Sequence, residues 1–329
     1  MKKIAMIAAL MATLGVGSTA QAADVTLRIA SQLPPKSHIV QNLDLFKKEV
    51  EEKSNGSIAV EIYDSATLYK DKEIPSAVGS GSIEMGSASL TRYAGDVPAV
   101  DVFYQPFLID SEEKVRAAVA PGSPVRGPLD KAIADTGSTV LWWQAYGGTI
   151  MLSKGAPIHT PKDLEGKKVR VFGKSLGQFV EAAGGAPTLI SGSEQYLAYQ
   201  RGTVDVGMTG ISGVKSRKLW EVMDTVTVTN LADVEFIVMI NTDFWNSLTD
   251  DQRAIITAAS RDAEKDVRDR MSAIEAEAFK EAEENGMTIY TPTEEELKQW
   301  RAVSQPVYDS FLKESGDLGK QVFDAAKKL

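Results

Sequence analysis

The feature of this sequence that most constrains its fold is a long uninterrupted helical segment in the C-terminal third of the chain. Thr249 and Gln252 have the spacing of a capping box, in which two side chains satisfy free backbone amides at a helix start. No proline follows before Asn285 and Gly286. The segment predicts a helix of more than about 30 residues, roughly 50 Å long. Few compact domains can accommodate such a rod.

The apolar residues of this segment recur at helical spacing, so one face of the predicted helix packs against protein. They are Ile255, Ile256, Ala259, Ala263, Val267, Met271 and Ile274. The opposite face is rich in charged residues, which are normally solvated. Two interpretations therefore stay open: a helix that ties two parts of the molecule together, and a long solvated helix with no mechanical role.

The first 22 residues have the organisation of a secretory signal peptide. Two lysines precede an apolar stretch over residues 4–16, and Ala20-Gln21-Ala22 matches a cleavage site. No later segment approaches the roughly 20 apolar residues of a membrane-spanning helix. The sequence contains no cysteine, which excludes a lipid-anchored N-terminus, a disulfide framework and a thiolate metal site. We expect a free periplasmic protein.

Charge and length narrow the class of protein further. Removal of residues 1–22 takes two lysines and no acid, so the formal charge moves from −9 for the whole chain to −11. Nucleic acids and anionic membrane surfaces need basic patches, and this balance argues against both. An anionic small ligand is still allowed, because one arginine in a closed cleft acts locally. A mature chain of about 300 residues exceeds one usual core, so we expect two domains.

Strands and helices alternate along the N-terminal part, which predicts an α/β fold with a mostly parallel sheet. The expected strands are residues 25–30, 58–63 and 85–88, and the expected helices are residues 39–53 and 74–81. Ligands of such sheets collect at the carboxyl ends of the strands. Gln32, Ser89 and Arg92 follow such ends, although loop polarity or helix capping accounts for Gln32 and Ser89 equally well.

Arg170 is the strongest candidate for contact with a ligand. It lies in the apolar run KKVRVF at residues 167–172, immediately before Gly173 and Ser175, so a guanidinium sits where a short buried strand meets a turn. A strand end holds a side chain rigidly, and the planar fork of arginine can grip a carboxylate with two parallel hydrogen bonds. For an isolated arginine, the commoner alternative is an exposed ion pair with a surface acid.

The surroundings of Arg170 resemble a known family. The segments DLEGKKVRV and SEQYLAYQRGTVD, at residues 163–171 and 193–205, look like the core signature of the DctP-type substrate-binding proteins of TRAP transporters. Further segments match the same family in the same order: LPPKSH at 33–38, FKKEVEEKSNG at 46–56, IEMG at 83–86, QPFL at 105–108, KLWEV at 218–222 and INTDFW at 240–245. Each motif alone is weak, but their ordered succession over nearly the whole mature chain is specific.

The resemblance implies a two-domain periplasmic binding protein fold of the type II-like TRAP subclass, with a long helix that spans both domains. Residues 139–152 resemble the strand that crosses between the domains, and the chain is expected to cross back near residues 231–236. The expected domains are residues 23–147 plus 235–275 and residues 148–234 plus 276–329. Gly147 and Gly148 are a candidate hinge, although they fit equally well a loop in which backbones approach closely.

The resemblance also implies a function. A protein of this family captures a small organic acid between its domains and delivers it to the small and large subunits of a TRAP membrane permease. The carboxylate would pair with Arg170, and domain closure would exclude water and strengthen that contact. No cofactor, metal or catalysis is implied, and the protein is expected to act as a monomer.

Two departures from the family pattern narrow the expected solute. Some relatives carry a second arginine where this sequence has Ile150, and many have asparagine where it has Thr209. Both changes remove hydrogen-bonding capacity, which favours a compact monocarboxylate with an apolar or aromatic portion. Four aromatic residues are candidates for a matching wall, although each is more often a core residue: Tyr69, Tyr93, Phe172 and Phe236.

One charged pair is expected at the edge of the cleft. We expect Glu73 and Arg92 to form an ion pair that lines the cleft. If Glu73 were instead unpaired, its carboxylate would favour a ligand that carries an amine.

Other patterns do not support a catalytic or nucleotide-binding site. The glycine-rich segments at residues 79–83 and 207–213 lack both the G-x-G-x-x-G sequence and the lysine of a phosphate loop. His38 and His159 are the only histidines and lie on unrelated segments, which argues against a histidine metal site or a Ser-His pair. Two alternatives stay open: a periplasmic enzyme whose carboxylic acid substrate is anchored by Arg170, and a sensor partner that presents bound solute to a membrane receptor.

Overall fold

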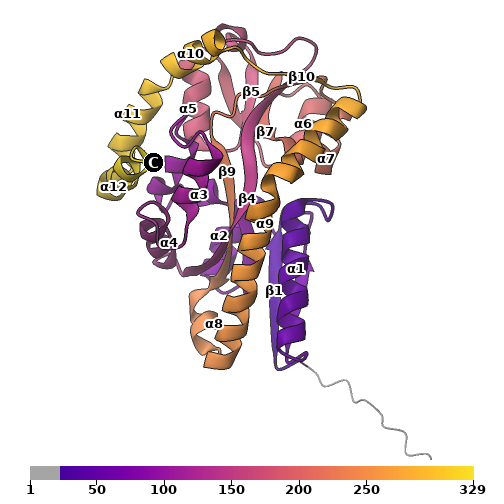
Figure 1. Cartoon of the computed structure of the whole chain (residues 1–329), viewed down its shortest axis with the longest axis vertical. Coiled ribbons are helices and arrows are strands. Elements are labelled where there is room, and N and C mark those ends of the chain that lie inside the picture. Colours follow the sequence, from indigo (N-terminus) through magenta and orange to yellow (C-terminus); the bar gives the residue numbers. More distant parts are fainter. Residues whose placement is uncertain (1–22) are drawn as a thin grey trace, which may run out of the picture.

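The structure of the protein, a computed structural model, describes residues 23–329, so the predicted signal peptide at residues 1–22 lies outside the described part. One sheet runs through the molecule in the order β2-β1-β3-β9-β4-β7-β5-β6, and β8 pairs with both β4 and β10. The strands are β1 Val25–Ser31, β2 Ile58–Tyr63, β3 Met85–Ser89, β4 Ser138–Ser153, β5 Lys168–Val171, β6 Ala186–Leu189, β7 Val206–Gly210, β8 Thr225–Thr227, β9 Asp233–Asn241 and β10 Thr288–Tyr290. Helices surround this sheet, which confirms the predicted α/β class (Figure 1).

Strand β4 joins the two halves of the sheet, as expected for the crossing strand. Its first part pairs with β9, and its last part, from Thr149 to Ser153, pairs with β7. A register shift between Ala145 and Gly147 lies just before this change of partner. Gly147 has a φ of 100°, and a Cβ there would lie 2.3 Å from Glu275 Oε1. Only glycine fits this position, and it lies within a strand and not in a loop.

The sheet is mixed, whereas the sequence suggested a mostly parallel one. Parallel pairs occupy the flanks, where β1 pairs with β2 and β3, β5 pairs with β6 and β7, and β8 pairs with β10. Strands β4 and β9 form only antiparallel pairs, with each other and with β3, β7 and β8. The sheet is mixed because β4 and β9 cross between the two halves and are antiparallel to the strands beside them.

The long helix predicted from the sequence is α9, Asp250–Glu284, which has 35 residues and the predicted capping box at its start. Ile256 and Ala259 pack in a core with β1, β2 and helix α1, His38–Lys53. Ala278 and Ala282 belong to a second core around helix α7, Ile211–Arg217. Figure 1 shows α9 running beside α1 at one end and reaching α7 at the other. The helix therefore ties the two halves together and does not lie free in solvent.

Shorter helices complete the fold. The α-helices are α2 Ile74–Gly79, α3 Glu112–Val119, α4 Arg126–Ala134, α5 Lys174–Ala182, α6 Gln195–Gln200, α8 Thr242–Ser247, α10 Glu294–Ala302, α11 Gln305–Glu314 and α12 Gly316–Ala326. The 3-10 helices are η1 Asp71–Glu73, η2 Leu90–Tyr93, η3 Pro98–Tyr104, η4 Pro161–Leu164 and η5 Leu219–Glu221. The expected elements of the N-terminal part match β1, α1, β2, α2 and β3 to within two residues.

The two C-terminal helices contact both halves of the molecule. Helix α11 packs against α5 and η3, and α12 packs against η3 and α4. Phe311 and Phe323, whose ring centroids lie 6.0 Å apart, share one core with Tyr104 of η3. The division into residues 23–147 plus 235–275 and residues 148–234 plus 276–329 stays a prediction.

Candidate functional site

Strand ends from both halves meet around a small pocket that encloses about 30 Å³. Seven predicted site residues line it: Gln32, Ser89, Arg92, Arg170, Phe172, Thr209 and Phe236. The other lining residues are Leu33, Asp71, Tyr146, Gly192, Gln195, Gly210, Arg217 and Val234. Ser89 and Gly210 end β3 and β7, and Gln32 and Phe172 directly follow β1 and β5. The carboxyl ends of the strands thus converge on one place, as an α/β sheet requires of a ligand site.

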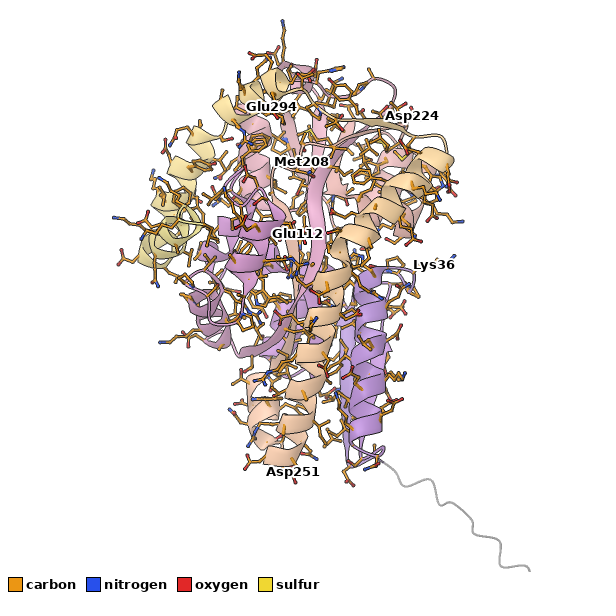
Figure 2. The ribbon with its side chains drawn as sticks, viewed as in Figure 1. Lys36, Glu112, Met208, Asp224, Asp251 and Glu294 are labelled. Atoms are coloured by element: carbon orange, nitrogen blue, oxygen red, sulfur yellow. The ribbon has the colours of Figure 1, made fainter. Side chains whose placement is uncertain are left out.

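Arg170 is held by backbone oxygens and has no countercharge. Its Nε donates to Ile190 O at 3.0 Å, and its Nη1 donates to the carbonyl oxygen of Met208, a residue of β7 that is labelled in Figure 2. Only 3% of Arg170 is exposed. Burial lowers the pKa of Arg170, and the neighbouring Arg217 and Arg92 lower it further. Within residues 23–329 no carboxylate pairs with its charge.

A second guanidinium in the pocket, that of Arg217, is absent from the sequence prediction. Arg217 is the last residue of α7, is half-buried, and donates from Nη1 to Tyr146 Oη at 3.3 Å. Tyr146 in turn packs against Phe236, with ring centroids 5.2 Å apart. An arginine at a helix C-terminus is normally a solvated cation that complements the helix dipole. The sequence therefore held no signal for this placement.

The third arginine of the pocket is already neutralised. Arg92 Nε donates to Asp71 Oδ2, and Asp71 Oδ1 accepts from Ser89 N at 3.2 Å. The predicted ion pair between Glu73 and Arg92 is therefore wrong. Glu73 is exposed, and its carboxylate accepts from Lys70 N at 2.9 Å, which closes the turn of η1 from outside. Since Glu73 does not line the pocket, it offers no site for a ligand amine there.

Polar contacts connect the two sides of the pocket. Gln32 Oε1 accepts from Ser193 N at 3.1 Å and from Ser191 Oγ at 3.3 Å. These bonds join the end of β1 to the segment before α6. Gln195, at the start of α6, is buried and accepts from Tyr199 Oη at 3.3 Å.

The other predicted site residues do not line the pocket: Tyr69, Glu73, Tyr93 and Ile150. Ile150 pairs across strands with Thr209 but is 1% exposed and belongs to the core around α7, so an arginine there would enter that core. Tyr93 is fully buried in the largest core, and Tyr69 is half-buried against it. Successive residues of a 3-10 helix point about 120° apart, so Arg92 and Tyr93 cannot face the pocket together.

The arrangement suits a small anion. Arg170 and Arg217 offer charge-assisted hydrogen bonds, and Thr209 adds a hydroxyl. Phe172 and Phe236 supply apolar walls that exclude water. Within residues 23–329 no cluster of acidic or histidine side chains could hold a metal ion.

Comparison with known protein families shows to which family the chain belongs. The family described as bacterial extracellular solute-binding protein, family 7, or DctP, matches residues 29–315. The chain belongs to the DctP family. The resemblance of the motifs around Arg170 is thereby confirmed, and the chain is a solute-binding protein by family.

Individual relatives match this chain over nearly their whole length. It is 26% identical over 315 residues to the C4-dicarboxylate-binding periplasmic protein DctP of Rhodobacter capsulatus, covering 95% of this chain and 94% of that protein. A TRAP periplasmic solute-binding protein of Sulfurospirillum deleyianum, solved with bound succinate, has a TM-score of 0.85 and 25% identity, covering 91% and 98% of the two chains. A Bordetella pertussis extracytoplasmic solute receptor binding pyroglutamic acid has a TM-score of 0.87 and 19% identity, covering 92% and 99%.

These structures confirm the predicted fold of TRAP periplasmic solute-binding proteins. Among the helices of residues 23–329, none combines the length and apolar character needed to cross a membrane.

Proposed function

We propose that this member of the DctP family captures a compact organic acid in the pocket around Arg170 and delivers it to a TRAP membrane permease. The observation that carries the proposal is the buried guanidinium of Arg170, which no described carboxylate neutralises. A buried charge without a partner is unfavourable. Backbone oxygens use its Nε proton and one Nη1 proton, which leaves the other Nη protons to hold a ligand carboxylate.

Relatives support this class of ligand. The Rhodobacter capsulatus protein is named as C4-dicarboxylate-binding, and the two solved structures described above have succinate or pyroglutamic acid as their ligand. The sequence favoured a monocarboxylate because Ile150 replaces an arginine of some relatives. Arg217 supplies a second cation from a different element, so the proposal includes compact acids with one or two anionic groups.

Binding is proposed to draw the two sides of the pocket together. Gln32 on one side and Ser193 on the other already share a hydrogen bond of 3.1 Å. Closure excludes water, and a lower local dielectric strengthens the contact between Arg170 and a carboxylate. A ligand that makes this contact only when the halves are together shifts the population toward the closed form. Strands β4 and β9, with Gly147, are the proposed hinge.

The remaining assignments follow from the same proposal. Residues 1–22 are proposed to direct export to the periplasm, where the mature protein acts as a monomer without a lipid anchor or cofactor. Arg170 then binds the acid and catalyses nothing. Of the two alternatives, an enzyme would convert the bound acid, and a sensor partner would bind it without supporting uptake through a permease.

The experiment combines ligand identification with transport. Native mass spectrometry of the purified protein and a thermal-shift screen of organic acids should find an acid bound once per chain and recovered unchanged. An acid at 100 times its Kd stabilises the protein by about 2.7 kcal/mol. Uptake of that acid into proteoliposomes containing the permease should require the protein. Conversion of the acid would indicate an enzyme, and the absence of binding by any acid would contradict the proposal.

A further inference from the structure

A groove lies on the far side of two pocket residues. It encloses about 500 Å³ between η2, η3, the start of α5 and the end of α11. Of the residues that line this groove, Arg92 and Phe172 also line the ligand pocket, which encloses only about 30 Å³. These two side chains therefore form a partition between the small pocket and a much larger space.

The two residues of this partition are held in different ways. Arg92 is tied to Asp71 by an ion pair in which the side chains are 10% and 0% exposed. The Phe172 ring is held by packing: the guanidinium carbon of Arg170 lies 5.3 Å from its centroid, and the Tyr104 ring meets it edge-on at 5.9 Å. Phe172 can therefore be made smaller without leaving a buried charge, whereas Arg92 cannot.

The ring is placed to meet the carbon chain of a bound acid. A carboxylate on Arg170 lies next to Phe172, because the guanidinium stacks over that ring. A chain that extends from this carboxylate toward the groove reaches the ring first. Beyond the ring, the groove offers apolar surface from Pro98, Leu189 and Phe311.

We propose that Phe172 is a length filter, which restricts this protein to short acids by separating the pocket from the groove. The inference rests on the proposed function, because it requires the acid to be held at Arg170. In the native protein a long chain has to displace the ring or turn away from the groove. Without the ring, the chain continues into the groove and buries its methylenes, each of which tightens binding roughly fourfold.

The experiment is a chain-length series. Isothermal titration calorimetry gives the Kd of acetate, butyrate, hexanoate and octanoate for the native protein, Phe172→Ala, Phe172→Leu and Leu189→Ala. Leu189 is the matched control, because it lines the groove but not the pocket and is 63% exposed. We expect native affinity to fall with the longer acids, and Phe172→Ala to bind octanoate at least tenfold more tightly. Phe172→Leu should lie between them, and Leu189→Ala should resemble the native protein.

The length filter is overturned if Kd depends on chain length in the same way in the native protein and the Phe172 variants. It is also overturned if the variants bind every acid more weakly by the same factor. Phe172→Leu decides the matter if melting curves show that Phe172→Ala is unfolded. Arg170→Ala, measured in the same series, separates the two proposals. If Arg170→Ala abolishes binding of short acids while the Phe172 variants leave the dependence of Kd on chain length unchanged, only the length filter fails. If short acids bind equally well without Arg170, both proposals fail. If the native protein binds none of the four acids, the length filter fails, and the proposed function is decided by the wider screen of acids.

Discussion

Lys70 Nζ lies 2.9 Å from Glu194 Oε1, and this ion pair connects the segment before η1 with the segment before α6. Gln32 and Ser193 join the same two sides of the pocket nearby. The ion pair therefore favours contact between these two sides of the pocket, which is the form proposed above to hold the ligand. Its side chains are 48% and 50% exposed, so solvent screens the attraction and its contribution is modest.

Reversing either charge of this pair should speed ligand release. Lys70→Glu and Glu194→Lys each replace an attraction with a repulsion, and we expect the dissociation rate to rise about two- to fivefold, as for exposed pairs worth up to about 1 kcal/mol. The double variant restores the attraction and should return the rate to near the native value. Stopped-flow fluorescence measures the rates, and 1 M salt should remove the differences. A double variant as fast as the single variants would contradict a direct interaction.

Replacing Arg170 should nearly abolish binding. Arg170→Ala leaves the ligand carboxylate desolvated without a partner, a loss of about 2 to 5 kcal/mol, or roughly 30-fold to several thousand-fold in Kd. Arg170→Lys should restore only part of the affinity, because an ammonium keeps the charge but loses the planar fork. Calorimetry on the three proteins tests this. Near-native affinity in a folded Arg170→Ala protein would refute the organic-acid proposal.

Melting temperatures are the control for these variants, and we expect Arg170→Ala to melt at a lower temperature than the native protein. The alanine variant leaves the carbonyl oxygens of Ile190 and Met208 without their donors. An unsatisfied buried acceptor costs about 1 to 3 kcal/mol. Some loss of stability is therefore expected for this variant.

Arg217 should matter most for acids with a second anionic group. Arg217→Met keeps the apolar stem and removes the charge, so we expect the Kd of succinate to rise at least tenfold, and the Kd of butyrate to change much less. The ratio of the two affinities, measured by calorimetry, is the informative quantity. An equal loss for both acids would mean that Arg217 only shapes the pocket through its contact with Tyr146.

Stability should fall as the pH decreases below about 6.5, in part because of His38. The buried His38 ring donates from Nε2 to Ala145 O at 2.9 Å, and burial lowers its pKa to about 4. Between the ordinary histidine pKa of about 6.5 and this value, the unfolded chain binds a proton that the folded protein does not. As the pH decreases through this window, the free energy of unfolding therefore decreases by up to about 3 kcal/mol.

His38→Gln is the matched variant for this effect, because its amide can still donate to Ala145 O but does not titrate. Urea denaturation of both proteins at pH 7.5, 5.5 and 4.5 should give a smaller loss of stability in the variant. If the two proteins lose stability in parallel, other groups account for the pH dependence.

Local patterns in the sequence determined helix α9 and the position of Arg170. A capping box at Thr249 and the absence of proline act within a few residues, so α9 follows from the sequence wherever the helix packs. The short apolar run before Gly173 likewise predicts a strand end, and it carries Arg170 into the pocket. The ordered motifs were sufficient to predict the DctP family as well.

Only the tertiary structure decided which neighbours Arg170 has. Arg217 joins the pocket because α7 packs beside Tyr146, more than seventy residues earlier in the chain. Asp71 neutralises Arg92 in place of Glu73, because Asp71 is buried beside the pocket whereas Glu73, two residues later in η1, is exposed to solvent. The spacing of residues along the chain determines the period of a helix or strand. Which neighbours a side chain contacts depends on where distant segments meet, and these contacts form only when the two halves pack together.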